Sequence, residues 1–267
     1  MLKTNFYQIN KAVKLKKLNH SDVLLLAFQK KALIDDNNDL LSKFIDHVKK
    51  FKIIPSQLYQ DVFASFIVGE RFDKTFLEFG ATNGLDLSNS YALEMFLDWK
   101  GVLAEPDYNW FSDLKKNRPN TEIVNECVWS KSGKKLNFWS ADNGELSTIN
   151  DFKENGIEFY KGNVAERNRA GKNVTVNTIS LNDLIKNKFK SKCPSYISID
   201  TEGSEVEILK NFNFNDYRPI VFTIEHSFTI NELEIDKLMY ANNYLRIFKD
   251  LTLFDAWYVE KRVLDFI

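Results

Sequence analysis

Residues 75–84 read Thr-Phe-Leu-Glu-Phe-Gly-Ala-Thr-Asn-Gly, and this stretch decides the fold. The apolar run Thr75–Phe79 predicts a buried strand, and a turn with two glycines follows it directly. Glycine lets the backbone approach a ligand at the carboxyl end of a strand, where open α/β sheets bind ligands. The spacing Gly80-x-x-x-Gly84 differs from the GxGxxG that holds a pyrophosphate, and Glu78 suits an ammonium group instead. A plain tight turn is the alternative interpretation.

Short apolar runs alternate with helical segments after this turn, which predicts a mostly parallel sheet with helices on both faces. Near the end, two apolar runs lie close enough together to form a hairpin, hence an antiparallel edge. The expected strands are Thr75–Phe79, Gly101–Ala104, Glu122–Trp129, Tyr196–Ile199, Ile220–Ile224, Tyr244–Phe248 and Ala256–Val259. The expected helices are Leu85–Leu97, Tyr108–Lys116 and Ser204–Asn211.

The first 70 residues predict an α-helical extension, because apolar residues recur at helical spacing and no glycine precedes Gly69. The run Asp35–Asn38 predicts a break between two helices, and a further helix is expected around Gln57 to Phe66. We therefore expect residues 1–70 to form the extension and residues 71–267 the α/β domain. The extension could form the contact surface of a homodimer, or it could instead shield the ligand site of the α/β domain.

Composition excludes several classes of protein. Hydrophobic residues make up 44% and charged residues 27%, and 36 basic against 37 acidic residues leave a net charge of −1. This nearly equal balance gives no broad basic surface that would bind nucleic acid or anionic lipid. The apolar run Val23–Phe28 is too short for a membrane span or a signal peptide. Cys127 and Cys193 form no CxxC, which indicates buried thiols in a reducing cytoplasm.

Regular alternation fails between Ser140 and Asn173, where Asn and Gly are frequent. Such an insert inside a compact domain is typical of a functional or mobile segment, and we expect the substrate to enter over it. Its cations could attract a phosphorylated or nucleotide-linked sugar, although exposed cations are usually just solvated. These cations are Lys161, Arg167, Arg169 and Lys172.

Polar residues stand at the ends of several predicted strands. Glu105 follows Gly101–Ala104, where an acidic side chain can accept both hydroxyls of a ribose. The alternative for Glu105 is a favourable charge at a helix N-terminus. Cys127 and Val128 end the next strand and could flank an adenine ring.

A second set of polar residues ends the later strands. Asp200 and Glu202 follow Tyr196–Ile199, and Glu225 and His226 follow Ile220–Ile224. His226 is a possible general base, because its ordinary pKa lies near neutral pH. Asp200, Glu225 and His226 could instead bind a divalent ion that orients a hydroxyl. Polar residues that merely cap helices or the sheet are the alternative.

At these residues the sequence resembles the FkbM family of methyltransferases, over about three quarters of the chain from Ser56 to Val259. The matching segments are Ser56–Asp61, Glu78–Gly84, Leu87–Ser90, Ala104–Pro106, Leu146–Thr148, Val176–Leu184, Ser198–Glu205 and Glu225–His226. Two residues depart from the family pattern. Asn83 stands where an acidic residue is common, and Tyr59 stands where a small residue is common.

The resemblance implies a class I methyltransferase fold of the Rossmann-like type, with seven strands of which the last is antiparallel. It implies S-adenosylmethionine as donor and O-methylation of a hydroxyl on a sugar or other small metabolite. The implied cofactor contacts are Glu78, Gly80, Ala81, Asn83, Ser88, Asn89, Glu105, Pro106, Cys127 and Val128. The catalytic residues we expect are His226 or Asp200 as base, with Glu202 and Glu225 orienting the acceptor or binding Mg²⁺ or another divalent cation.

Two other functions remain open from the sequence. An NAD-dependent oxidoreductase shares the strand–turn–helix site but has a different glycine spacing. A non-catalytic domain with the same fold is the other alternative, although it has no physical need for Asp200, Glu225 and His226.

Overall fold

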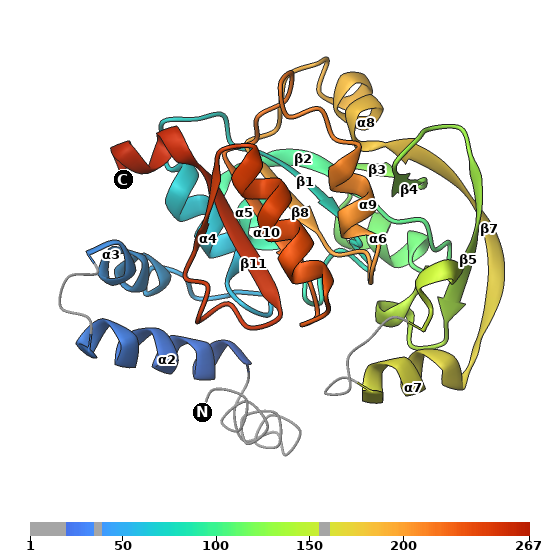
Figure 1. The fold of residues 1–267 in the computed structure, drawn as a ribbon, viewed down its shortest axis with the longest axis horizontal. Coiled ribbons are helices and arrows are strands. Elements are labelled where there is room, and N and C mark those ends of the chain that lie inside the picture. Colours follow the sequence, from blue (N-terminus) through green and yellow to red (C-terminus); the bar gives the residue numbers. More distant parts are fainter. Residues whose placement is uncertain (1–19, 35–38, 155–160) are drawn as a thin grey trace.

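A seven-stranded sheet forms the centre of the computed structural model, which describes residues 20–34, 39–154 and 161–267 (Figure 1). All neighbouring strands are parallel except that β11 runs antiparallel to both β9 and β10. The predicted class I methyltransferase sheet with its antiparallel hairpin is therefore confirmed. In spatial order the strands are β10 (Tyr244–Ile247), β11 (Asp255–Glu260), β9 (Val221–Glu225), β8 (Tyr196–Ile199), β1 (Thr75–Phe79), β2 (Lys100–Ala104) and β3 (Glu122–Val124).

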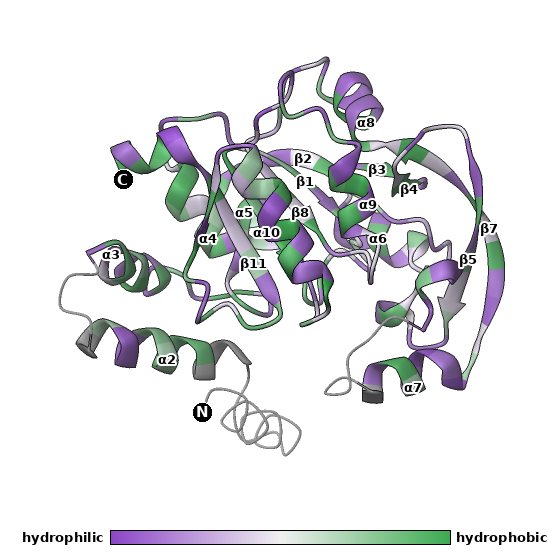
Figure 2. Ribbon diagram, viewed as in Figure 1, coloured by the Kyte–Doolittle hydropathy of each residue, from purple (hydrophilic) through white to green (hydrophobic). Residues whose placement is uncertain are grey.

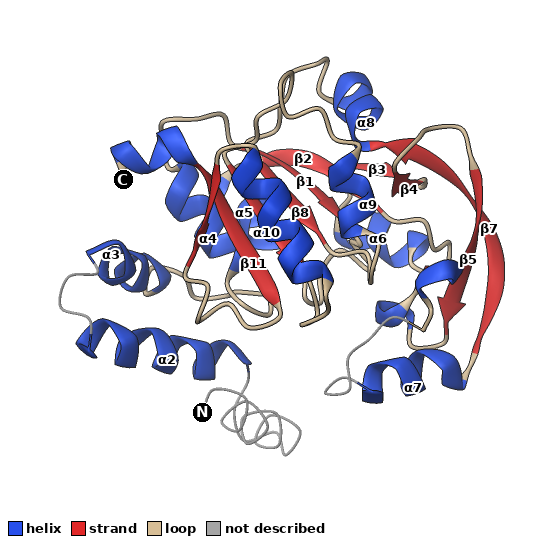
Figure 3. Cartoon of the chain, viewed as in Figure 1, coloured by secondary structure: helices blue, strands red, loops and turns tan. Residues whose placement is uncertain are grey.

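Helices cover both faces of this sheet (Figure 3). Successive side chains of a strand point to opposite faces, so Phe76 packs with one hydrophobic cluster and Leu77 with the other. Side chains from α4 (Gln60–Val68), α5 (Tyr91–Leu97) and α6 (Phe111–Asn117) belong to the first cluster. Those from α8 (Leu181–Lys188), α9 (Glu205–Lys210) and α10 (Asn231–Ala241) belong to the second. No helix among the described residues is long and apolar enough to span a membrane.

The N-terminal helices share the first hydrophobic cluster with the sheet. Phe63 of α4 stacks on Trp257 of β11 with 4.5 Å between ring centroids. Phe44 of α3 (Asp39–Val48) meets the same indole edge to face at 5.8 Å, and Phe28 of α2 (His20–Ile34) packs on Phe44 at 5.4 Å. These aromatic contacts bury large apolar areas. The extension is thus attached through one continuous core, and a domain boundary at residue 70 stays a prediction. The predicted break at residues 35–38 lies outside the described residues.

A second sheet contains β4 (Cys127–Trp129), β7 (Gly171–Ser180), β5 (Lys135–Ala141) and β6 (Thr148–Ile149) in that order. The predicted strand Glu122–Trp129 is therefore wrong as one element, because its two halves pair in different sheets. Hydrophilic and hydrophobic residues alternate along β7 (Figure 2). The apolar side chains of β7 therefore share one face of this sheet with those of the neighbouring strand β5, where they contact one another. The insert between Ser140 and Asn173 is correspondingly more regular than expected. It also holds η1 (Gly144–Leu146), η2 (Asn150–Phe152) and α7 (Lys161–Arg169).

Two predicted helices begin later than their apolar pattern suggested. The helix expected over Leu85–Leu97 starts only at Tyr91, because the preceding residues form a loop whose polar groups bind Glu78. The helix expected from Tyr108 starts at Phe111. A short 3₁₀ segment, η4 (Lys261–Phe266), follows β11. The extra loop residues lie at the carboxyl ends of the strands, where they help to build the site.

Candidate active site

One cavity of about 450 Å³ runs along the carboxyl ends of the central strands. Glu105 after β2 and Cys127 of β4 line one part of it, and Asp200 after β8 and Glu225 of β9 line another. Because β11 is antiparallel, its first residue, Asp255, also reaches this edge. All of the cofactor contacts expected from the sequence line this cavity, with the exception of Asn83.

Gly80 allows the loops after β1 and β8 to lie against each other. Its φ of +82° is in the left-handed region, and a Cβ there would lie 1.8 Å from the carbonyl oxygen of Asp200. No side chain fits at that distance, so only glycine is compatible with this turn. The turn is anchored by a hydrogen bond of 3.1 Å from the Gly80 amide to the Ala104 carbonyl.

Glu78 binds the loop that precedes α5. Its carboxylate accepts hydrogen bonds from the Asn89 amide at 2.8 Å and the Ser88 hydroxyl at 3.0 Å, and also from the Ser90 hydroxyl. Buried Arg118, at the end of α6, donates to both serine hydroxyls and to the Gly84 carbonyl. One wall of the cavity is thus formed by Glu78, Ser88 and Asn89. Hydrogen bonds from Ser88 and Asn89 to the Glu78 carboxylate hold this wall together.

Asn83 shapes the glycine-rich turn from outside the cavity. Its Oδ1 accepts hydrogen bonds of 2.9 Å from the amides of Leu85 and Asp86, as Asn commonly does in turns. Its Nδ2 donates to the carboxylate of Asp86, which does line the cavity. Asp86 therefore supplies an acidic group close to the position where the family pattern suggested one.

Glu105 is buried at the end of β2 and is held in place by backbone donors. Its carboxylate accepts hydrogen bonds from the Thr82 amide at 2.9 Å and from the Asp107 amide at 2.8 Å. Burial raises the pKa of Glu105 to about 7, although these two amides act in the opposite direction. A carboxylate has about four acceptor positions, so two hydroxyls of a ribose can still be bound.

Cys127 and Val128 lie on the cavity wall in β4, which pairs with Thr178 and Ile179 of β7. Burial raises the pKa of the Cys127 thiol to about 12, so this thiol is neutral and behaves as an apolar group. Phe138 of β5 lines the same cavity. These side chains form an apolar wall that suits an aromatic base.

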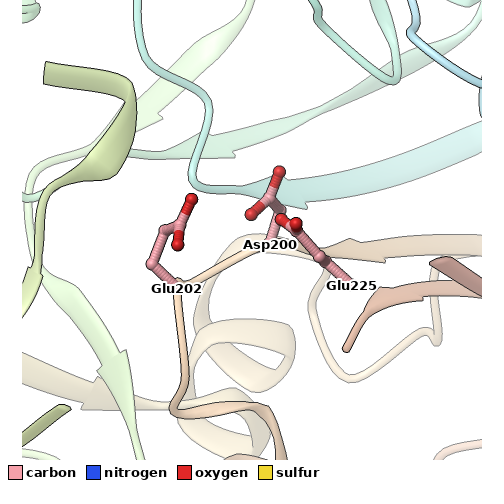
Figure 4. A group of neighbouring side chains, drawn as sticks. All are labelled: Asp200, Glu202 and Glu225. Carbon is pink, nitrogen blue, oxygen red and sulfur yellow. The ribbon is translucent and has the colours of Figure 1, made fainter. Parts of the chain in front are cut away.

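Three carboxylates meet where β8 and β9 end (Figure 4). One oxygen from each of Asp200, Glu202 and Glu225 lies within 4.8 Å of the others. Burial, and then the charge of Glu225, raises the pKa of Asp200 well above its ordinary value, and the same causes raise the pKa of Glu202 to about 8. Burial and mutual repulsion disfavour ionisation of all three carboxylates together, so the group favours binding a proton or a cation.

Arg167 is a cation that pairs with this group, and it is not among the described residues that line the cavity. The sequence suggested that this residue is an exposed cation of the insert, but its side chain is only 2% exposed. It forms an ion pair with Glu202 and donates to the carbonyls of Leu146 and Lys153. The prediction of an exposed cation at Arg167 is therefore wrong, because α7 turns this side chain inward.

His226 is placed differently from the three carboxylates, and it is absent from the cavity lining among the described residues. Its Nε2 lies 3.1 Å from a guanidinium nitrogen of Arg246, and its Nδ1 lies 4.0 Å from Glu232. Burial lowers the pKa of His226 to about 4, and Arg246 contributes to this. Since neighbouring side chains at a strand end point to opposite sides, Glu225 faces the cavity and His226 does not. Glu202 occupies the place in the acidic group that the sequence suggested for His226.

Sequence reasoning missed the residues that the starts of α4 and β11, and the loops before them, add to the cavity. Gln57, Gln60, Phe254 and Asp255 all line it. The Gln60 side chain hydrogen-bonds to Asp255, whose pKa burial raises to about 7. Only the resemblance of Ser56–Asp61 to a family segment pointed to this region, because nothing local places α4 beside β11.

Comparison with solved structures gives distant likenesses. The precorrin-6y C5,15-methyltransferase of Geobacter metallireducens GS-15 has 12% identity and a TM-score of 0.36, covering 73% of this chain and 75% of that one. A putative RNA methyltransferase from Pyrococcus horikoshii has 10% identity and a TM-score of 0.37, covering 78% and 87%. The SAH-bound methyltransferase of Podospora anserina has 12% identity and a TM-score of 0.35, covering 88% and 95%. No curated protein matches the chain.

A match to a family model is more informative than these structures. The model of the methyltransferase FkbM domain matches residues 78–252, which is well over half of the 267 residues. The matched segment includes Glu78, Gly80, Glu105, Asp200 and Glu225, which the structure brings to one cavity. The chain therefore belongs to the FkbM family of methyltransferases.

Proposed function

We propose that the protein transfers the methyl group of S-adenosylmethionine to a hydroxyl oxygen of a sugar or other small metabolite. The observation that carries this proposal is that Glu105 and the carboxylate triad (Asp200, Glu202 and Glu225) line the same cavity. Glu105 is suited to a ribose, and the triad to an acceptor hydroxyl. A cavity of this size, with a few converging polar groups, is typical of a small-molecule site.

The residues present fit the cofactor along β1, β2 and β4. Glu105 offers buried acceptor positions for ribose hydroxyls, and Cys127 and Val128 offer an apolar surface for adenine. Glu78, which is already bound to Ser88, Asn89 and Ser90, positions the wall on which the amino-acid end would lie. Asp86 lies two residues after this turn and also lines the cavity, and it suits the cofactor ammonium.

The reaction asks little covalent chemistry of the protein. When bound, S-adenosylmethionine would supply an electrophilic methyl group for transfer to the acceptor oxygen. The protein has to align the two partners and remove the hydroxyl proton. We assign proton removal to the ionised form of Asp200, because its backbone lies against the cofactor turn at Gly80 and its carboxylate lies beside Glu225. Glu202 and Glu225 orient the hydroxyl.

A divalent cation is a second use of the same triad. Carboxylate oxygens are the ligands that Mg²⁺ prefers, and the three oxygens are close enough to share one ion. In that case Asp200, Glu202 and Glu225 would hold the ion, which would orient and acidify the hydroxyl. Activity that is lost in EDTA and restored by Mg²⁺ would support this role.

The test of the proposed function is transfer of a labelled methyl group from S-adenosylmethionine to a small-molecule extract. We expect Asp200→Asn to lower the rate by about 100-fold or more, as loss of a general base commonly does. His226→Gln, with its neutral side chain away from the cavity, should keep most of the activity. Equal rates for Asp200→Asn and the wild type would contradict the role of Asp200, and loss only in His226→Gln would transfer it to the histidine.

A further inference from the structure

The charge of the cavity carries information on the acceptor, and this inference rests on the proposed function. Ten of the described residues that line the cavity are Asp or Glu, and among these described residues none is Lys, Arg or His. Cofactor binding accounts for some of this acidity, because S-adenosylmethionine carries a sulfonium and an ammonium group. The acidic side chains are not confined to the cofactor part of the cavity.

The acceptor part of the cavity lies at β8, β9 and β11, on the far side of Gly80 from Glu105. Asp200, Glu202, Glu225 and Asp255 line this part. Of these four carboxylates, only that of Glu202 has a cationic partner within the described chain, and this partner is Arg167. Glu225 accepts a hydrogen bond of 2.6 Å from the Ser227 hydroxyl, and Asp255 accepts from the Trp257 indole and the Gln60 amide. Asp200 hydrogen-bonds to Glu225, so these three carboxylates have no cationic partner among the described residues.

A second observation concerns Asn89, which is 8% exposed and lines the cavity beside Ser198 of β8, where the cofactor wall meets the acceptor part. Its Nδ2 donates to the Ser198 hydroxyl at 3.0 Å, whereas its Oδ1 has no hydrogen-bond partner among the described residues. A buried acceptor atom without a donor costs about 1–3 kcal/mol, so a ligand that donates to it would be favoured. The wall thus presents acceptor atoms, both charged and neutral, to the ligand.

We propose that the methyl acceptor is a hydroxyl compound that carries a protonated amine and has no phosphate or carboxylate group. An ammonium group donates three hydrogen bonds and offsets the charge of the carboxylates. A phosphate would meet acidic side chains with no basic side chain of the described lining to balance it. A divalent ion at the triad would offset only part of this charge, so the exclusion of anions holds with or without a metal.

The experiment compares three sugars of matched size as ligands of the protein saturated with S-adenosylhomocysteine, in EDTA. The probes are glucosamine, glucose and glucose 6-phosphate, and binding is measured by ligand-observed NMR. We expect glucosamine to bind about tenfold more tightly than glucose, and glucose 6-phosphate more weakly than either, since one close charge pair commonly contributes this much. Glu225→Gln should reduce the preference for glucosamine. Glu122→Gln, on β3 and exposed, is the matched control and should not change it.

The proposal is overturned if glucose 6-phosphate binds more tightly than glucosamine, or if the three probes do not differ, including the case in which none binds. Binding of glucose 6-phosphate that appears only after addition of Mg²⁺ would also overturn it, because the triad would then bridge a metal to an anionic acceptor. Failure of S-adenosylhomocysteine to bind is a different result, which contradicts the proposed function. The same three probes, applied without it, would still decide the charge preference.

Discussion

Arg167 and Glu202 form a largely buried ion pair, with side chains 2% and 15% exposed, that joins the insert to the loop after β8. Thr148 of β6 adds a hydrogen bond of 3.0 Å to the Glu202 carbonyl. Glu202 has a φ of +57°, which a non-glycine residue adopts only when its surroundings hold it there. The insert is therefore part of the support of the triad, and it does more than cover the cavity.

Removal of this ion pair should lower the stability of the folded protein. We expect Arg167→Ala to lower the free energy of unfolding by about 3 kcal/mol, because the Glu202 carboxylate loses its cation in a buried place. Arg169→Ala is the matched control on the same helix, since its side chain is 76% exposed, and it should change stability by about 0.5 kcal/mol or less. Urea unfolding measures both. The double variant Arg167→Ala/Glu202→Gln should recover part of the loss, and equal effects of the two arginine variants would contradict this account.

Two glycines with similar backbone conformation offer a matched test of the close approach at the site. Gly80→Ala would place a Cβ 1.8 Å from the Asp200 carbonyl oxygen, whereas Gly133, with φ +72°, has nothing within 4 Å of such an atom. We expect Gly133→Ala to cost about 1 kcal/mol from backbone strain alone. Gly80→Ala should lower the free energy of unfolding by about 4 kcal/mol or more, because the carboxyl ends of β1 and β8 must move apart. Similar unfolding midpoints for the two variants would mean that the two loops can move apart easily.

Asp61 of α4 predicts a specific dependence of stability on pH. Burial raises its pKa from 3.8 to about 7, and its Oδ2 has no partner among the described residues. Between these two values the unfolded chain releases the proton while the folded chain keeps it, so stability falls as pH rises through this window. Relative to Asp61→Asn, the free energy of unfolding of the wild type should fall by at most about 4 kcal/mol as the pH rises from 3.8 to about 7. A stability difference that does not change with pH would contradict the burial of this acid.

Glu105 predicts that cofactor affinity rises with pH. Its pKa of about 7 is raised by burial, and ribose hydroxyls that donate to the carboxylate favour the ionised form. Binding therefore releases a proton, and affinity for S-adenosylhomocysteine should be about tenfold higher at pH 8 than at pH 6. In Glu105→Gln the affinity should be lower, and this contribution to the pH dependence should disappear. An unchanged pH profile in the variant would assign the ribose to other residues.

The strand ends were the most predictable part of the protein from its sequence. Glu78, Glu105, Asp200 and Glu225 each follow a short apolar run, and the carboxyl ends of parallel strands meet at one edge of a sheet. Local pattern and topology are therefore sufficient to bring these residues together. Whether they hold the cofactor and the acceptor as expected stays a prediction.

The partners of these residues could not be predicted, because they come from distant segments. Nothing in the run Lys115–Arg118 indicates that Arg118 is fully buried against the loop that Glu78 binds. The inward turn of Arg167 depends on the second sheet, whose strands β5 and β7 pair across a long insert. Whether Glu225 or His226 points into the cavity depends on the register of β9, and a pattern of polar residues does not define that register.

The central claim is that this cavity binds an adenosyl cofactor, and calorimetric titration with S-adenosylhomocysteine tests it most directly. We predict micromolar binding that Glu105→Ala weakens by about tenfold or more, as loss of a charged hydrogen-bonding partner commonly does, and no comparable binding of NADH. Absence of S-adenosylhomocysteine binding in a folded protein, or preferential binding of NADH, would contradict the account.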